Sequence, residues 1–359
     1  MTAIKIARNS VSNFNLINFF LAFIWFSQIT GQPMRDYDKD MQQKHADLKG
    51  YDPQYRVNYF ENIIIKSFIT TNESNFQFRS LTNNEVIDLI PAGQYLLGLS
   101  LDYKWIAIEA SFSPDFLQSN VVQNSSATSY SVSLNFFYSD QWRQELRLLY
   151  NQGFVNRNRD SNSLIIDQNL LNSTTLTMLQ GSTFYIANNN FSYRAHYAQT
   201  ERQLTSAGSF IPTLRYAYSV VNPNLPPQST GTATDFESVD ITAQLGYLHT
   251  FVTSQKWYLT LGVFAGLGYN HAAYEITNGN DLTFNNTIFA VEPEFGMGYN
   301  DYRWFFGISG NWRNFNHTNN EAGQFSRQQA YFLMHLGYRF NDNKPMRQFF
   351  GWFEEHLGF

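Results

Sequence analysis

Hydrophobic and polar residues alternate with a period of two along most of the chain from Asn62 onward. In the segment 332–340 every second residue is apolar (Phe, Met, Leu, Tyr and Phe), and the residues between them are Leu, His, Gly and Arg. Because successive side chains of a strand point to opposite faces, this pattern predicts a strand with one apolar face. The pattern recurs in segment after segment, so the shared apolar face must be buried in lipid or against a second sheet.

Thirteen segments carry this pattern. They are 62–71, 94–103, 105–113, 129–139, 142–152, 176–187, 191–199, 209–221, 238–252, 257–270, 287–300, 302–314 and 326–340. Bacterial membrane barrels close with an even number of strands, so one assignment must be wrong. The miscount is expected between about 200 and 256, where two segments form one element or part of 222–237 adds a strand; 76–80 is a further candidate. We predict 12 strands, with 14 as the alternative.

Four of the seven tryptophans follow short turns and open the next strand. They are Trp105, Trp142, Trp257 and Trp304. Rings with an apolar body and a polar edge favour the headgroup level of a bilayer, so a barrel aligns them on one rim. The repeat predicts a single antiparallel transmembrane β-barrel with short turns at that rim and long loops at the other. A secreted β-sandwich shows the same alternation but does not require the tryptophan repeat.

Composition narrows the class of protein. Aromatic residues make up 17% of the chain and charged residues 15%, which suits strands that are apolar on one face. Outside the N-terminal segment no run of 18 apolar residues occurs, so a helical membrane protein is excluded. There is no cysteine, which rules out disulfides, thiolate metal sites and a lipidated cysteine anchor. The net charge of −5 gives no basic excess for nucleic acid.

Four regions are expected. Residues 1–31 resemble a signal peptide, with Lys5 and Arg8 ahead of an apolar run at 16–29; an N-terminal membrane anchor is the alternative. Residues 32–60 form a polar periplasmic extension, and 61–340 form the barrel. Residues 341–359 form an interfacial tail, in which 346–359 predict a short amphipathic helix. The protein is therefore expected in a Gram-negative outer membrane.

The segment 191–210 reads FSYRAHYAQTERQLTSAGSF. This run resembles the signature of an uncharacterised outer-membrane barrel family from Bacteroidota, classed as a domain of unknown function. The Tyr-Lys-Trp turn at 103–105 and the glycine-rich segment 261–268 are also similar to that family. The resemblance covers most of 60–340 and implies an outer-membrane location, but no activity and no catalytic residues.

If the apolar face meets lipid, the polar face lines the lumen. The candidate lumen residues carry charges of both signs and are Glu109, Arg147, Arg194, His196, Arg215, Glu292, Glu294, Arg303 and Arg339. An unpaired charge away from water is costly, so these residues are expected to pair; a substrate path is the other interpretation. Glu292 and Glu294 share a face of one strand, and Arg303 on the adjacent hairpin arm is their expected partner. Pro293 between them predicts a bulge.

Two segments are candidates for docking a partner. The polar joint at 200–209 is either a hydrogen-bonded turn that fixes strand register or a loop that folds into the lumen or docks a partner. The aromatic tail is an interfacial anchor, a plug or a docking segment. The candidate residues are Glu201, Arg202, Gln203, Phe349, Phe350, Trp352 and Phe353.

Function is less constrained than fold. We expect a structural or accessory subunit of a larger cell-envelope assembly, in contact with outer-membrane lipids and other envelope proteins. A narrow channel for a small solute is the alternative, and a lipid-modifying barrel enzyme a weaker one. No Gly-x-Ser-x-Gly or His-Glu-x-x-His motif or phosphate loop occurs, and the histidines are dispersed, so no catalytic residue, cofactor or metal site is predicted.

Overall fold

A computed structural model describes residues 37–46, 51–71, 73–80, 86–118, 127–156, 168–222, 233–254, 256–276, 282–317 and 323–357. The chain divides into two compact units, Met1–Asp40 and Met41–Phe359. Of the first unit only 37–40 is described, as the start of helix α2 (Tyr37–Lys44). The expected signal peptide lies outside the described residues. Within these ranges no helix is long and apolar enough to cross a membrane.

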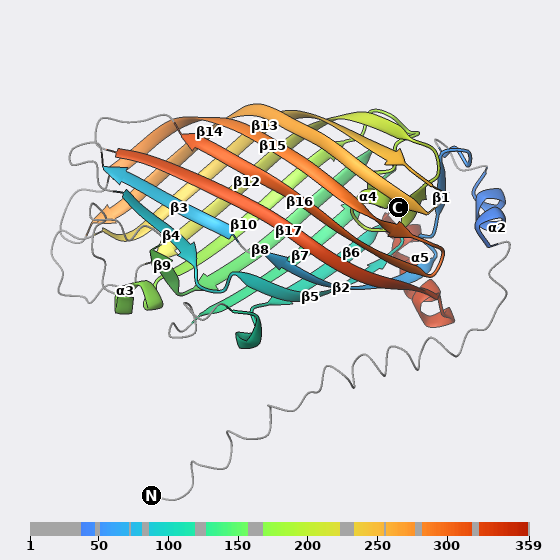
Figure 1. The fold of residues 1–359 in the computed structure, drawn as a ribbon, viewed down its shortest axis with the longest axis horizontal. Coiled ribbons are helices and arrows are strands. Elements are labelled where there is room, and N and C mark those ends of the chain that lie inside the picture. The colour runs from blue at the N-terminus through green and yellow to red at the C-terminus, as the bar shows by residue number, and fades with distance from the viewer. Residues whose placement is uncertain are drawn as a thin grey trace, which may run out of the picture. The chain divides into compact units, whose positions relative to one another are not determined.

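The second unit is a closed antiparallel β-barrel of 12 strands, which confirms the predicted fold and strand number (Figure 1). The wall strands are β2 (Asn62–Thr71), β5 (Tyr95–Tyr103), β6 (Ile106–Phe112), β7 (Thr128–Phe137), β8 (Trp142–Gln152), β10 (Thr175–Tyr185), β12 (Ala207–Asn222), β13 (Ala233–Val252), β14 (Trp257–Ile276), β15 (Leu282–Asn300), β16 (Trp304–His317) and β17 (Gly323–Asn341). Each wall strand pairs with its neighbours, and β17 closes the ring by pairing with both β16 and β2.

Three further strands extend the wall on one side. Strand β3 (Glu73–Ser80) follows β2 along the same partner β17, from Glu73 opposite Ala330 to Ser80 opposite Gly323. It then pairs with β4 (Val86–Pro91), which pairs with β9 (Phe154–Asn156) beyond the end of β8. The candidate strand at 76–80 is therefore part of β3, a continuation of β2 and not an additional wall strand. Short helices η1 (Asp115–Leu117) and α3 (Gln168–Ser173) lie in the connections.

The predicted strand at 191–199 is wrong, and this accounts for the odd count. The miscount therefore lies just ahead of the region 200–256 in which it was expected, where β12 and β13 are two separate wall strands. Residues 193–196 form one turn of helix, α4 (Tyr193–His196), which Ser192 caps by accepting from the Ala195 N–H. The segment imitates a strand because polar Ser192, Arg194 and His196 alternate with apolar neighbours. However, Ser192 and Tyr193, which alternation would place on opposite faces, are both buried. The segment lies inside the barrel, where every direction is covered.

The exterior of the wall is apolar and the interior is polar. Along β12, Leu214, Tyr216 and Tyr218 are exposed, whereas the alternate residues Arg215 and Ser219 are buried. The four tryptophans mark the β5–β6, β7–β8, β13–β14 and β15–β16 turns, all on one side of an antiparallel ring, as predicted. We call this edge the tryptophan rim. Strand β2 begins there and β17 ends there, followed by helix α5 (Lys344–Leu357) (Figure 1).

Candidate functional site: a plug inside the barrel

The connection between β10 and β12, residues 186–206, enters the barrel from the tryptophan rim, and we call it the plug. Phe191 and Tyr193 pack there with wall residues Phe184 and Phe264 in a buried apolar cluster. After α4 the chain reverses at Gln199, whose φ of 59° lies in the left-handed region that residues other than glycine seldom adopt. The chain then forms the short strand β11 (Glu201–Gln203).

Residues just ahead of the barrel add a strand to the plug. Strand β1 (Arg56–Asn58) pairs antiparallel with β11, with Arg56 opposite Gln203 and Asn58 opposite Glu201. Two backbone bonds extend this pairing, from the Tyr59 N–H to the Thr200 carbonyl (2.8 Å) and from the Leu204 N–H to the Tyr55 carbonyl (2.7 Å). The N-terminal extension is therefore bound to the plug by backbone hydrogen bonds.

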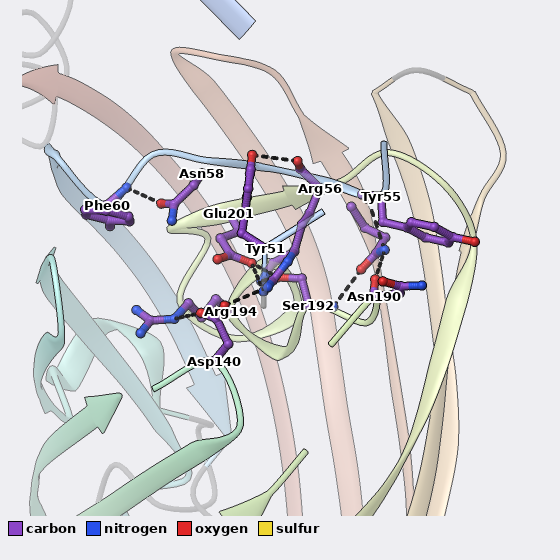
Figure 2. A network of polar contacts seen from close by, with 12 residues as sticks. Tyr51, Tyr55, Arg56, Asn58, Phe60, Asp140, Asn190, Ser192, Arg194 and Glu201 are labelled. Carbon is purple, nitrogen blue, oxygen red and sulfur yellow. Dashed lines mark hydrogen bonds and ion pairs between the residues drawn. The ribbon is translucent and has the colours of Figure 1, made fainter. Parts of the chain in front are cut away.

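Buried ion pairs reinforce the junction between the extension and the plug. We call this cluster of Arg56, Glu201 and Asp140 the latch. Figure 2 shows Arg56 pointing between Glu201 of the plug and Asp140 of the β7–β8 turn, at 3.2 Å and 2.6 Å respectively. Burial alone would lower the pKa of Arg56, but the two carboxylates raise it above its usual value, so the guanidinium stays charged. The Ser192 hydroxyl also donates to Glu201, and the Tyr51 hydroxyl donates to the Arg56 carbonyl. The latch thus joins the extension, the plug and the wall.

Arg339 of β17 holds the plug from the opposite wall. Its side chain is fully buried and donates to the Gln199 carbonyl at 2.6 Å and to Asn300 Oδ1 at 2.7 Å. Asn300 in turn donates to Gln199 Oε1 at 2.8 Å. These charge-assisted bonds satisfy the carbonyl that the left-handed turn exposes. The predicted lumen residue Arg339 is therefore a clamp on the plug.

Two more arginines stack on aromatic rings around the plug. The guanidinium of Arg194 lies 4.3 Å from the Phe137 ring centre and donates to the Lys104 carbonyl. Arg143 lies 3.6 Å from the centre of the Tyr197 ring and donates to Asn135. Cation–π contacts gain strength when they are shielded from water. The rings therefore stabilise the charges of both arginines, and the contacts help to hold the plug in place.

The inward carboxylates of β15 are paired, as the sequence indicated, but not with the expected base. Glu292 accepts from Arg313 at 2.7 Å and forms an ion pair with Arg215 at 2.9 Å, and Glu294 lies 2.7 Å from His196 of the plug. Arg303 instead lies beside the rim turn and donates to the Arg339 carbonyl. The reason is register: Glu294 pairs with Asn311 and Val291 with Asn314, which brings Arg313 beside Glu292.

The expected bulge at Pro293 is absent. Pro293 stands opposite Val263, and the register continues unbroken on both sides of it. The pairing with β16 keeps one register from Val291 to Glu294, although no ladder contact is made at Glu292 or Pro293. The proline therefore removes a hydrogen bond and leaves the path of the strand unchanged.

A cavity of about 80 Å³ lies in the lumen next to the plug. Glu109, Arg147, Arg215, Glu294 and Arg313 line it, together with plug residues Tyr193 and Tyr197. Glu109 pairs with Lys66 at 3.0 Å, and Arg147 donates to Ser131. A void of this size holds a few water molecules. The plug forms its floor.

The docking candidates divide into two groups. Glu201, Arg202 and Gln203 are buried and engaged within the protein, so they present no surface to a partner. Gln203, for example, donates to the Tyr55, Asn190 and Thr205 carbonyls. In contrast, Phe349 and Trp352 are exposed, while the Phe350 ring packs on Tyr103 and Trp105 and the Phe353 ring on Trp105.

Sequence reasoning missed two of the three latch residues, Arg56 of the extension and Asp140 of the wall. Arg56 is an isolated base in a polar stretch, and Asp140 resembles an ordinary turn residue; no sequence spacing links either to Glu201, which is 145 residues from Arg56. The alternation of Tyr55, Val57 and Tyr59 was the available hint of a short strand. No cluster of three or more His, Asp or Glu side chains suited to a metal occurs in the described part of the chain.

Comparisons with solved structures give only remote likenesses. No curated protein matches the sequence. Similar solved structures include an outer membrane channel from Pseudomonas putida F1 (10% identity, 78% of this chain and 96% of that one, TM-score 0.35). A bacterial polysaccharide outer membrane secretin (8%, 78% and 99%, 0.34) and the P. putida toluene transporter TodX (8%, 82% and 92%, 0.27) are also similar.

A family model covers nearly all of the barrel together with the strand that binds the plug. It matches residues 50–340, which run from just before the latch to the end of β17. The chain belongs to the family described as Domain of unknown function (DUF4421).

Proposed function

We propose that this protein is a closed barrel of the Gram-negative outer membrane that serves as a structural or accessory subunit of a cell-envelope assembly. The observation that carries the proposal is the plug, which fills the barrel at the tryptophan rim and is fixed by the latch and by Arg339. A pore does not require buried ion pairs across its own opening. The exposed apolar exterior and the tryptophan rim support the membrane location.

The proposal places the tryptophan rim, the extension and α5 on the periplasmic side, because short turns face the periplasm in outer-membrane barrels. Export by the segment 1–31 is part of the proposal and rests on its basic start and apolar run. Other envelope proteins are the proposed partners. No enzymatic step is part of the proposal; it assigns His196, whose Nε2 lies 2.7 Å from a Glu294 carboxylate oxygen, to holding the plug.

A narrow path for a small solute is the second candidate. The cavity of about 80 Å³ and the inward arginines and glutamates favour it, because charged rings select ions. Such a path requires the plug to move. The two candidates therefore differ in whether the resting barrel conducts.

Two measurements on the full chain separate them. The tagged protein is purified from its native outer membrane in mild detergent, and its conductance is recorded in planar bilayers. A stoichiometric set of copurifying envelope proteins and a silent bilayer are expected. Glu201→Ala and Arg339→Ala, which loosen the plug, should give current. A wild-type protein that purifies alone and conducts steadily would overturn the proposal in favour of the path.

A further inference from the structure

Helix α5 lies at the tryptophan rim and is attached to it by aromatic contacts. The Phe350 ring centre is 4.7 Å from Tyr103 and 5.8 Å from Trp105, and Phe353 is 6.3 Å from Trp105. Figure 1 shows the helix crossing the end of the barrel near the start of β2. The helix is therefore held across the rim.

Only part of the apolar face of α5 is used in this way. At 100° per residue, Phe349, Phe350, Trp352 and Phe353 share one side of the helix, and Arg347 and Glu355 lie on the other. The Phe349 side chain is 58% exposed and Trp352 is 55% exposed. Two large rings beside a packed interface thus remain uncovered.

We propose that these rings insert into the headgroup layer of the periplasmic leaflet, so that α5 anchors the rim to the lipid surface. This inference rests on the proposed outer-membrane location. The exposed rings continue the aromatic girdle of the barrel. Trp105 stacks on Phe136, and Phe136 stacks on the outward-facing Tyr138. Aromatic rings at this position occupy the headgroup level, so Phe349 and Trp352 lie at a depth where lipid is the adjacent medium.

The absence of cysteine from the chain makes a direct test possible. Single cysteines replace Phe349 or Trp352 and carry an environment-sensitive dye such as NBD, in phosphatidylethanolamine–phosphatidylglycerol nanodiscs. Arg347→Cys and Glu355→Cys are matched controls on the polar face of the same helix. Leu267→Cys, on the exposed exterior of β14, reports whether the barrel itself is in the bilayer.

The labels at 349 and 352 are expected to show blue-shifted emission and loss of intensity with nitroxide lipids, while those at 347 and 355 report water. If position 267 reports lipid but 349 and 352 report water, the anchor is refuted and the membrane location stands. If position 267 also reports water, the location itself fails. Heat-modifiable migration of each labelled variant checks that the barrel is folded.

Discussion

Removing the guanidinium of the latch should loosen the plug selectively. In Arg56→Met the apolar stem is kept, but Glu201, which is fully buried, loses its cationic partner. Breaking a buried pair in this way costs about 3–5 kcal/mol. Asp140 is 28% exposed and can be hydrated, so the cost falls mainly on the plug. At about 1.4 kcal/mol per factor of ten, plug opening should increase roughly 100- to 4000-fold.

Hydrogen exchange followed by mass spectrometry measures this opening. The informative amides are those of Tyr59 and Leu204, which bridge the extension and the plug. Both should exchange faster in Arg56→Met, while β13 and β14 stay protected. The double variant Arg56→Met/Glu201→Gln should recover part of the protection, since no bare carboxylate is then buried. Arg347→Met removes an exposed pair with Asp342 and should change nothing. Unchanged exchange at Tyr59 and Leu204 in Arg56→Met would refute the latch.

Three further predictions concern the wall and the extension. Glu292→Gln leaves Arg215 and Arg313 without their shared carboxylate, so the folded band on a detergent gel should convert at a clearly lower temperature; an unchanged conversion temperature would mean that water replaces the pair. Gly246→Val should lower that temperature too, because a Cβ there would lie 2.1 Å from the Phe264 ring, whereas Gly351→Ala, with open space around it, should not. Burial lowers the pKa of His45 despite nearby Glu61. Below a pH of about 6.5 the unpacked imidazole therefore binds a proton that the packed one does not. The packing of His45 on Phe60 should weaken as the pH falls through this range. Limited proteolysis near 45–61 tests this, and cleavage should be faster at pH 5.5 than at pH 7.5. In the control variant His45→Phe, cleavage should be equal at the two pH values.

The barrel could be predicted because a period of two repeats in segment after segment, and a closed ring is the arrangement that leaves no strand edge in lipid. The plug could not. Its segment 191–199 has the same alternation as a wall strand, and what makes it different is burial on all sides, which appears only after the ring closes. One more contact, between Arg313 and Glu292, could have been predicted from the sequence. A short turn at 300–304 fixes the register of β15 and β16, and this register brings Arg313, not Arg303, beside Glu292.

Contacts between residues far apart in the sequence could not be predicted from the alternation of apolar and polar residues. Arg56, Asp140 and Glu201 meet because three separate connections converge at the rim, and the tilt and stagger of the strands decide which connections do so. The prediction that the Glu292 and Glu294 side chains face the lumen was correct, because the face of a strand on which a residue lies depends only on the alternation along that strand. Residue direction is thus local information, whereas residue pairing is a property of the closed ring.

The plug is covalently joined to the wall at both ends, by β10 and by β12. When the latch breaks, the released segment stays within a few nanometres of its seat, at an effective concentration in the millimolar range. Spontaneous opening is therefore brief and self-reversing. A lasting open state requires a molecule that binds the displaced segment, or the freed extension, more tightly than the barrel does. Whether the plug occupies the lumen is then decided by competition between the barrel and this molecule for the same segment, and the plug never leaves the protein.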